Sequence, residues 1–151
     1  MGNGREALHA GLETLLRNEL VSTRLVERNT DVPDDWETIL AEHPGTEAIV
    51  IVRDGRWSRA LRAGQTIWTH TPTIEGHVRR VGDTQIGTTS DTLLSEVVAI
   101  FDADDTLGGL CIEHELAMPE DPELNTEVPS AGSLMGWRIE VAAQVEETTD
   151  S

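Results

Sequence analysis

The chain contains no lysine and no tyrosine, and only one cysteine and one phenylalanine occur among its 151 residues. A single cysteine cannot form an internal disulfide, which excludes a disulfide-stabilised fold. The 11 basic residues, all arginine, stand against 28 acidic ones, and the formal net charge is −17. Nucleic acids and anionic membranes are bound through clustered basic side chains, so this charge balance argues against both as partners.

Long apolar runs are also missing from the sequence. None approaches the ~20 residues that a membrane-spanning helix needs, and the opening MGNGREALHA lacks the features of a signal peptide. The lack of lysine, the surplus of carboxylates and the 17 threonines are typical of proteins that work in a cytosol at very high salt. There, repulsion between carboxylates is screened. The sequence therefore predicts an acidic, halophilic, cytoplasmic protein.

The length and the hydrophobic fraction of 38% predict a single domain over residues 1–151, with a frayed tail from about residue 146. Apolar residues at helical spacing predict a helix from Arg5 to about Arg28 and another over Ser133–Glu147. Between them the pattern predicts a short helix over Trp36–Glu42 and a first strand pair, Thr46–Arg53 with Arg56–Ala63. An irregular stretch follows over Gly64–Gly87, and then a second strand pair, Leu93–Phe101 with Leu107–Glu115. Within that stretch, Ile67-Trp68 fits a short strand and Thr73–Val81 a helical turn. This order predicts an α+β domain, a mostly antiparallel sheet with its N- and C-terminal helices packed on one face.

The first strand pair has the clearest turn signal. Asp54-Gly55 is a preferred two-residue hairpin turn, and it would place Val52 opposite Trp57. Arginines recur here at a spacing of three, which splits them between the two faces of a strand pair, and we interpret them as partners of surrounding acids: Arg53, Arg56, Arg59 and Arg62. Trp57 and Trp137 are predicted to lie in the core.

The second strand pair carries a resemblance to a known family. Two segments joined by an acidic loop resemble the last hairpin of GAF domains: Ser95–Asp102 (SEVVAIFD) and Leu107–Glu113 (LGGLCIE). In that family the first strand begins with Ser-Glu and continues with hydrophobic residues. An Asp/Gly loop and a strand of the form Gly-hydrophobic-Leu follow it. Val141–Val145 is similar to the family's closing helix and Ala48–Leu61 to its first hairpin, whereas Ala99 stands where the family has proline. The resemblance implies a GAF-like or PAS-like fold and a stand-alone sensor domain that binds a small molecule.

The most similar branch, the free methionine-R-sulfoxide reductases, implies how a ligand would be held. Glu96 occupies a position that receives a ligand amine or amide there, and Glu113 and Cys111 fall on the second and first acidic positions of the partner strand. On neighbouring strands the two carboxylates would face one pocket and bind a cationic or amino group. Trp68 and His77 complete the candidate ligand contacts. The alternative for Glu96 is a solvent-exposed carboxylate at a strand start.

Thiol catalysis is not expected from this chain. The reductase branch carries its cysteines in the loop before Ser95, where this chain has Thr88-Thr89-Ser90. Cys111 fits a small buried residue better than a nucleophile. No compact metal-ligand pair such as C-x-x-C or H-E-x-x-H occurs. The sequence thus predicts no catalytic residue, no metal and no other cofactor.

Three functions are compatible with these observations. The first is a non-catalytic, GAF-like sensor for signal transduction, a homodimer through its terminal helices that binds a small ligand with a cationic or amino group. The alternative is a protein-interaction module without a pocket, which a closed, packed sheet face around Glu96 and Glu113 would favour. The third is a relative of the free methionine sulfoxide reductases.

Overall fold

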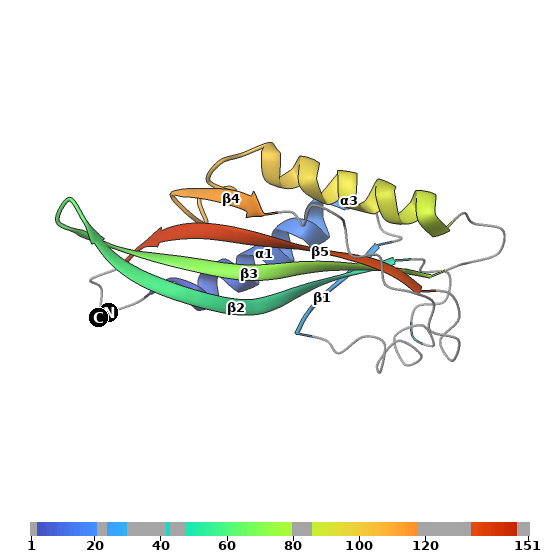
Figure 1. Ribbon diagram of the computed structural model, residues 1–151, viewed down its shortest axis with the longest axis horizontal. Helices are drawn as coiled ribbons and strands as arrows, with labels where there is room; N and C mark the ends of the chain where they lie inside the picture. The colour runs from blue at the N-terminus through green and yellow to red at the C-terminus, as the bar shows by residue number, and fades with distance from the viewer. Residues whose placement is uncertain are drawn as a thin grey trace.

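The computed structural model describes residues 3–20, 24–29, 42, 48–79, 86–117 and 134–147. In chain order its elements are α1 (Arg5–Glu19), β1 (Arg24–Arg28), β2 (Ala48–Arg62), β3 (Gln65–Arg79), α3 (Ile86–Asp102), β4 (Glu113–Ala117) and β5 (Leu134–Glu146). Helices beside one sheet confirm the predicted α+β class (Figure 1). The short helix predicted over Trp36–Glu42 lies outside the described residues except for Glu42.

The sheet has five strands in the order β1-β2-β3-β5-β4. β1 runs parallel to β2, and the other neighbouring pairs are antiparallel. β5 thus lies between β3 and β4, with Ile139 opposite Ile74 and Val141 opposite Leu116. Just beyond β5, the amide of Glu147 donates a hydrogen bond of 2.9 Å to the carbonyl of Thr66.

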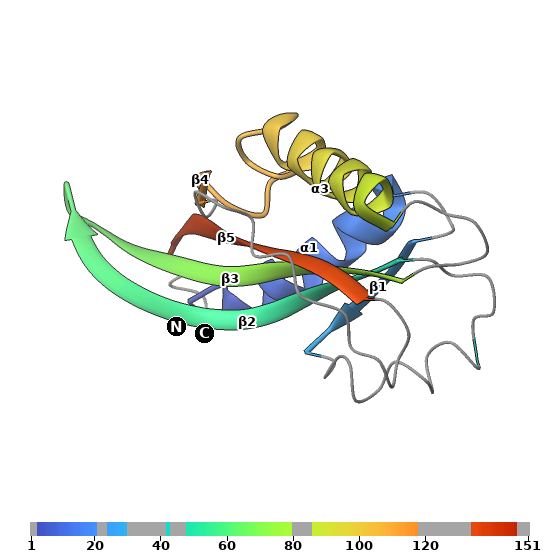
Figure 2. The ribbon, with the colours of Figure 1, turned by 45° about the vertical axis from the view of Figure 1, so that its right-hand side comes forward.

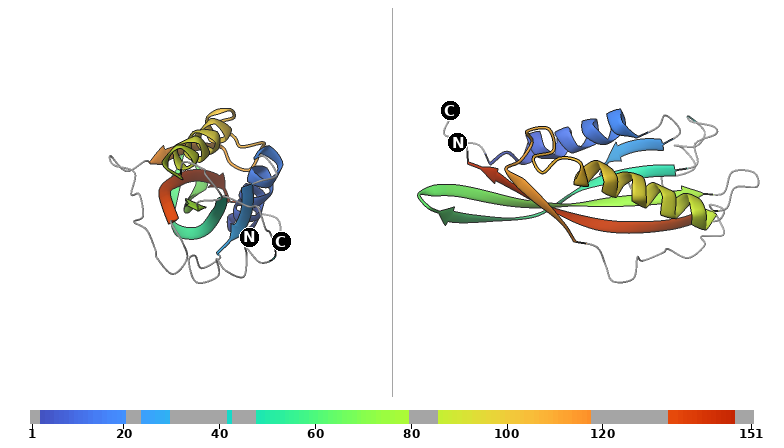
Figure 3. Two further views of the ribbon diagram at one scale, coloured as in Figure 1. Left: turned by 90° about the vertical axis from the view of Figure 1, so that its right-hand side faces the viewer. Right: turned by 90° about the horizontal axis from the view of Figure 1, so that it is seen from above.

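Both helices lie over one face of the sheet (Figure 3). A spacing of four residues puts one apolar stripe of each helix against the strands, and these stripes are fully buried: Leu8, Leu12 and Leu16 from α1, and Leu93, Val97 and Phe101 from α3. The strands contribute alternate residues to the same core, among them Val50, Val52, Ile74, Ile139 and Val141. The core therefore has two layers, helices on a sheet.

The segment from which the GAF resemblance was drawn is helical. Leu93–Phe101 was predicted as a strand and belongs to α3. The strand prediction is wrong because a short run of apolar residues fits either structure. Here the buried residues Leu93, Val97 and Phe101 recur every four positions. The partner strand predicted over Leu107–Glu115 is reduced to β4, which pairs with β5. The hairpin that carried the resemblance is therefore not formed.

The two predicted terminal helices also differ from the structure. The first ends at Glu19, since Leu20 is already extended (φ −83°, ψ 151°), and Arg24–Arg28 forms β1 beside β2. The second, predicted over Ser133–Glu147, is strand β5. Its buried residues alternate, as a strand requires: Trp137, Ile139, Val141 and Ala143. These positions also satisfy part of a helical pattern, and pairing with β3 and β4 decides for the strand.

The predicted turn at Asp54-Gly55 is a bulge inside one long strand. β2 continues through it to Arg62 and pairs with β3 on both sides, with the register shifting between Arg53 and Arg56. The chain reverses at Ala63-Gly64, whose φ values of 50° and 81° fit the two-residue turn with positive φ at both positions. Consequently Trp57 lies opposite His70. Within the middle stretch predicted as irregular, Gln65–Arg79 form β3. This confirms the short strand at Ile67-Trp68, and the helical turn predicted at Thr73–Val81 is wrong as far as Arg79, where this described range ends.

Candidate functional site

The far end of the β2–β3 hairpin is an arm that projects past the helices (Figure 2). We define the arm as Arg56–Arg62 of β2 and Gln65–Thr71 of β3. β5 accompanies β3 only as far as Ile67, and β1 accompanies β2 only over Ala48–Val52. The tip is therefore a two-stranded ribbon, and the outer edge of β2 in the arm carries no strand from the described parts of the chain. Such unpaired edges are points at which another chain can associate.

One face of the arm carries large side chains that are open to solvent. Trp57 is 58% exposed and Leu61 is 74% exposed. They share this face with Arg59, because side chains two apart along a strand point the same way. We call Trp57, Arg59 and Leu61 the arm patch. The structure thus corrects the prediction that Trp57 lies in the core; Trp137, 3% exposed, does lie there.

Aromatic contacts hold the arm patch in a fixed geometry. The ring centroids of Trp57 and Trp68 are 5.1 Å apart, and Trp68 stacks on His70 at 6.1 Å with an interplanar angle of 3°. The guanidinium carbon of Arg59 lies 5.7 Å from the centroid of the Trp68 ring, and Arg59 also pairs with Glu147 at 3.3 Å. These contacts pre-order Trp57 and Arg59, so these two side chains lose little freedom when a partner binds.

The base of the arm is fixed by a polar cluster around Asp54. Arg28 donates two hydrogen bonds to this carboxylate, of 3.0 and 2.8 Å, and Arg5 lies 3.3 Å from it. The hydrogen bonds from Arg28 hold the pKa of Asp54 below its usual value. His70 Nε2 lies 2.7 Å from the carbonyl oxygen of Asn3, which connects β3 to the start of α1. The bulge is therefore a rigid corner.

The charge of the arm is opposite to that of the whole chain. Its residues include Arg56, Arg59 and Arg62 and no acidic residue, in a protein with 28 acids. Three of the four predicted acid partners are confirmed, since Arg53 pairs with Glu75, Arg56 with Glu140 and Arg59 with Glu147. Arg62 makes no ion pair with any residue that the structure describes.

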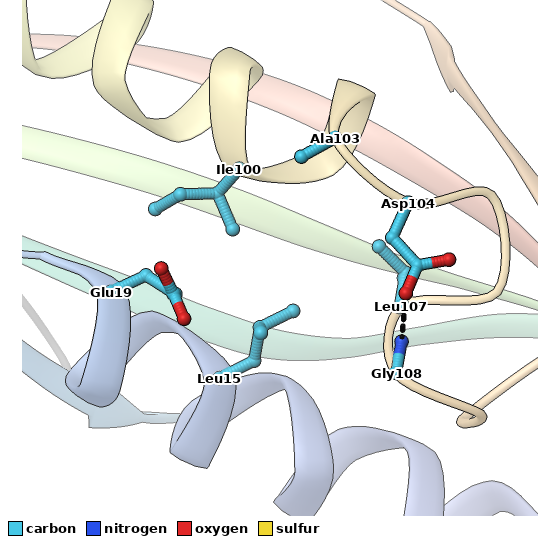
Figure 4. A pocket seen from close by; sticks show the side chains of 7 residues that line it. All are labelled: Leu15, Glu19, Ile100, Ala103, Asp104, Leu107 and Gly108. Atoms are coloured by element: carbon cyan, nitrogen blue, oxygen red, sulfur yellow. Dashed lines mark hydrogen bonds between the residues drawn. The ribbon is translucent and has the colours of Figure 1, made fainter.

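A groove lies on the helix side of the body, between α1 and the loop that follows α3 (Figure 4). Its volume is about 300 Å³, and a second groove of about 410 Å³ adjoins it across Leu107 and Gly108. The first, which we call the α1–α3 groove, combines apolar walls of Leu15, Ile100 and Leu107 with the carboxylates of Glu19 and Asp104. Amide hydrogen bonds from Thr106 and Gly108 to Asp104 hold the pKa of this carboxyl below its usual range.

The sequence-predicted ligand residues do not line either of these grooves. Glu96 is half-buried on α3, whereas Glu113 is exposed at the start of β4, so the two are not on neighbouring strands as expected. Trp68 is half-buried beside the arm patch, on the neighbouring strand opposite Arg59. The ligand-binding role of these residues stays a prediction.

His77 belongs to a polar cluster on the sheet face opposite the helices. Its Nε2 lies 3.0 Å from Oε1 of Glu75, and Nε of Arg53 lies 2.5 Å from the other oxygen. Burial works to raise the pKa of Glu75, but hydrogen bonds from His77 and Arg53 outweigh it and lower this pKa. The carboxylate thus stays charged between two donors, and we interpret the cluster as structural.

Cys111 is buried, with its Sγ 3.7 Å from the carbonyl oxygen of Asp105. Burial, with the charges of Asp104 and Glu113, raises the pKa of this thiol to about 11. A thiol that remains protonated is a poor nucleophile and a poor metal ligand. Across the described ranges, no three His, Cys, Asp or Glu side chains are grouped so as to hold a metal ion.

No family model matches the chain, and no curated protein matches it. Within the described ranges, no helix combines the length and apolar character needed to cross a membrane. The GAF assignment stays a prediction, and the hairpin from which it was drawn is helical in its first half.

Sequence reasoning missed the arm and the groove for different reasons. The arm had a visible signal, because no acidic residue occurs between Gly55 and Glu75 in a chain that is otherwise rich in them. The groove had none, since Leu15 and Glu19 are 85 residues or more from Asp104 in the sequence. Only the packing of α1 beside the loop after α3 brings these side chains together.

Proposed function

We propose that this chain is a non-catalytic assembly module that binds another protein through the arm. The observation that carries the proposal is the exposure of Trp57 and Leu61 on a ribbon that extends beyond the core. Large apolar side chains set among polar ones on a rigid surface are typical of interaction sites. Tryptophan and arginine, both present in the arm patch, are the residue types that contribute most to binding energy at interfaces.

The arm is better suited to binding protein than to binding a small molecule. A ligand pocket surrounds most of its ligand, whereas the arm patch is a projecting surface with no opposing wall. A projecting ribbon can instead enter a groove or extend a sheet in a partner. The raised pKa of Cys111 also argues against the thiol chemistry of the reductase alternative.

Site-specific photocrosslinking tests this proposal. A photoreactive phenylalanine would replace Leu61 in the protein expressed in its own cells, and the matched control would replace Ile112, which is 47% exposed outside the arm. We expect a protein adduct from position 61 and none from position 112, with the captured protein identified by peptide mass spectrometry. Absence of any adduct at position 61, or equal adducts at both positions, would refute arm-mediated binding.

A small-molecule sensor is a second candidate, favoured by the volume of the α1–α3 groove. About 300 Å³ lies at the lower end of the range for ligand sites, and Glu19 and Asp104 offer carboxylates to an amino group. A thermal-shift screen with amino acids and small amines in molar salt tests it. If a compound stabilises the wild type but not the Glu19→Gln variant, the groove is supported as the binding site. If its stabilising effect is lost only in the Glu96→Gln variant, the sequence-predicted site is supported. No stabilising compound would refute the sensor.

A further inference from the structure

The arm patch and the α1–α3 groove have complementary chemistry. The patch offers Trp57 and Leu61 with Arg59 between them, and Arg56 and Arg62 lie on the same ribbon. The groove offers apolar walls that carboxylates border on two sides (Figure 4). Arg56 and Arg62 point to the opposite face of the ribbon, so the patch presents an apolar surface with one cation, Arg59, to an apolar recess bordered by anions. Complementarity of this kind selects partners and fixes their orientation.

We propose that the arm patch of one copy of this chain docks into the α1–α3 groove of a second copy. The proposal rests on the proposed function, an arm that binds protein, and names the partner. Leu61 enters the groove against Leu15 and Ile100, and Arg59, on the same face of the arm, faces Glu19. A second copy is favoured over an unrelated protein because both halves of the contact are present on this chain.

The arm cannot satisfy the groove of its own chain. It continues the sheet on which the helices rest and leaves the body at one end (Figure 1, Figure 2). The groove, in contrast, is lined by residues of α1, of α3 and of the loop after α3 (Figure 4). The tilted ring contact between Trp57 and Trp68 and the ion pair of Arg28 with Asp54 fix that direction. A contact between two different surfaces of identical chains is head-to-tail, so it generates a ring or an open chain of copies.

Two single substitutions separate the halves of this contact. Leu61→Asp disables the arm patch and leaves the groove intact, and Glu19→Arg reverses a charge at the groove and leaves the arm intact. Glu19 and Leu61 are both exposed, and Glu19 makes no ion pair with any residue in the described ranges, so both variants should fold. Leu61→Ser provides a second arm variant. Glu115→Arg is the matched control, because it makes the same charge change at an exposed position of β4.

Sedimentation velocity in molar salt gives the expected results. The wild type and Glu115→Arg should form oligomers whose size grows with concentration, and Leu61→Asp and Glu19→Arg should associate at least about tenfold more weakly, as loss of a central contact implies. An equimolar mixture of Leu61→Asp and Glu19→Arg should form a dimer that neither forms alone. In that mixed dimer, the Glu19→Arg variant supplies the unchanged arm and the Leu61→Asp variant supplies the unchanged groove.

Three results would overturn the proposal: a monomeric wild type, a Glu19→Arg variant that associates like the wild type, or a mixture that forms no dimer. The second of these, with Leu61→Asp monomeric, would indicate that arms pair with arms. A monomeric wild type together with an adduct at position 61 would refute self-association alone, because the arm would then bind a different protein. A monomeric wild type with no adduct at position 61 would refute the proposed function as well.

Discussion

Replacing Gly55 with alanine should destabilise the protein strongly, because a side chain at this position would meet the backbone of β3. A Cβ at this position would lie 2.7 Å from the carbonyl carbon of Thr71 and 3.2 Å from the Cα of Pro72, and it would overlap the Thr71 carbonyl oxygen. All of these atoms belong to the backbone, so no side-chain rotation can relieve the contact. The two strands must separate at the bulge.

The magnitude follows from what that separation removes. Overpacking costs about 1–3 kcal/mol, and each strand hydrogen bond weakened beside the bulge adds roughly 1 kcal/mol. We therefore expect Gly55→Ala to lower the free energy of unfolding by about 2–4 kcal/mol. At roughly 2–4 °C per kcal/mol for a chain of this size, the melting temperature should fall by about 5–15 °C.

The control is Gly64 at the true turn, where a Cβ would have no heavy atom within 4 Å. Asparagine tolerates positive φ, so Gly64→Asn should cost less than about 1 kcal/mol. Thermal unfolding followed by circular dichroism in molar potassium chloride measures both variants. If Asp54-Gly55 were the hairpin turn, as the sequence predicts, the order of the two effects would be reversed. A Gly55→Ala variant as stable as Gly64→Asn would refute the bulge.

Two further predictions concern buried groups. Glu75→Gln removes a largely buried counter-charge from Arg53 and His77 and should cost about 2–3 kcal/mol at neutral pH in urea unfolding. Because the folded-state pKa of Glu75 is lowered, this stability is present above the ordinary glutamate value and is lost as the pH falls through the lowered pKa. The difference between wild type and variant should therefore disappear in acid, and a difference that is constant with pH would contradict the ion cluster. With its pKa raised to about 11, Cys111 should be alkylated by iodoacetamide at pH 8 at least about tenfold more slowly in the native protein than in urea, and equal rates would show an accessible thiolate.

The sequence was most informative where a pattern had only one structural solution. The leucines of α1 recur over three turns with polar residues between them, and only a helix buries them together. The α+β class followed from the mixture of such a helix with β-rich segments. Trp137 was correctly placed in the core, where its ring lies across Gly76 and a Cβ at Gly76 would overlap it.

The errors arose where local patterns were ambiguous and distant contacts decided the outcome. Asp54-Gly55 has the composition of a hairpin turn, yet Ala63-Gly64 closes the hairpin and Gly55 meets Thr71 from the neighbouring strand. The apolar residues of β5 fitted helical spacing, so a helix was predicted where a strand forms. Those of α3 fitted a strand, so a strand was predicted where a helix forms. Sheet pairing between segments far apart in the chain decides such cases, and it leaves little trace in a short stretch of sequence.

The dependence of self-association on salt tests which part of the proposed contact supplies its strength. At 1 M salt the Debye length is ~3 Å, so attraction between charges that stay exposed would contribute little. The apolar contact of Leu61 is unaffected by screening, and a charge pair enclosed within the contact, such as Arg59 with Glu19, is screened much less. Two copies that each carry a net charge of −17 also repel one another less as salt is added. We therefore expect association of the wild type, measured by sedimentation velocity, to strengthen as potassium chloride is raised toward molar concentration. Association that weakens with salt would mean that the arginines, and not Trp57 and Leu61, hold the copies together.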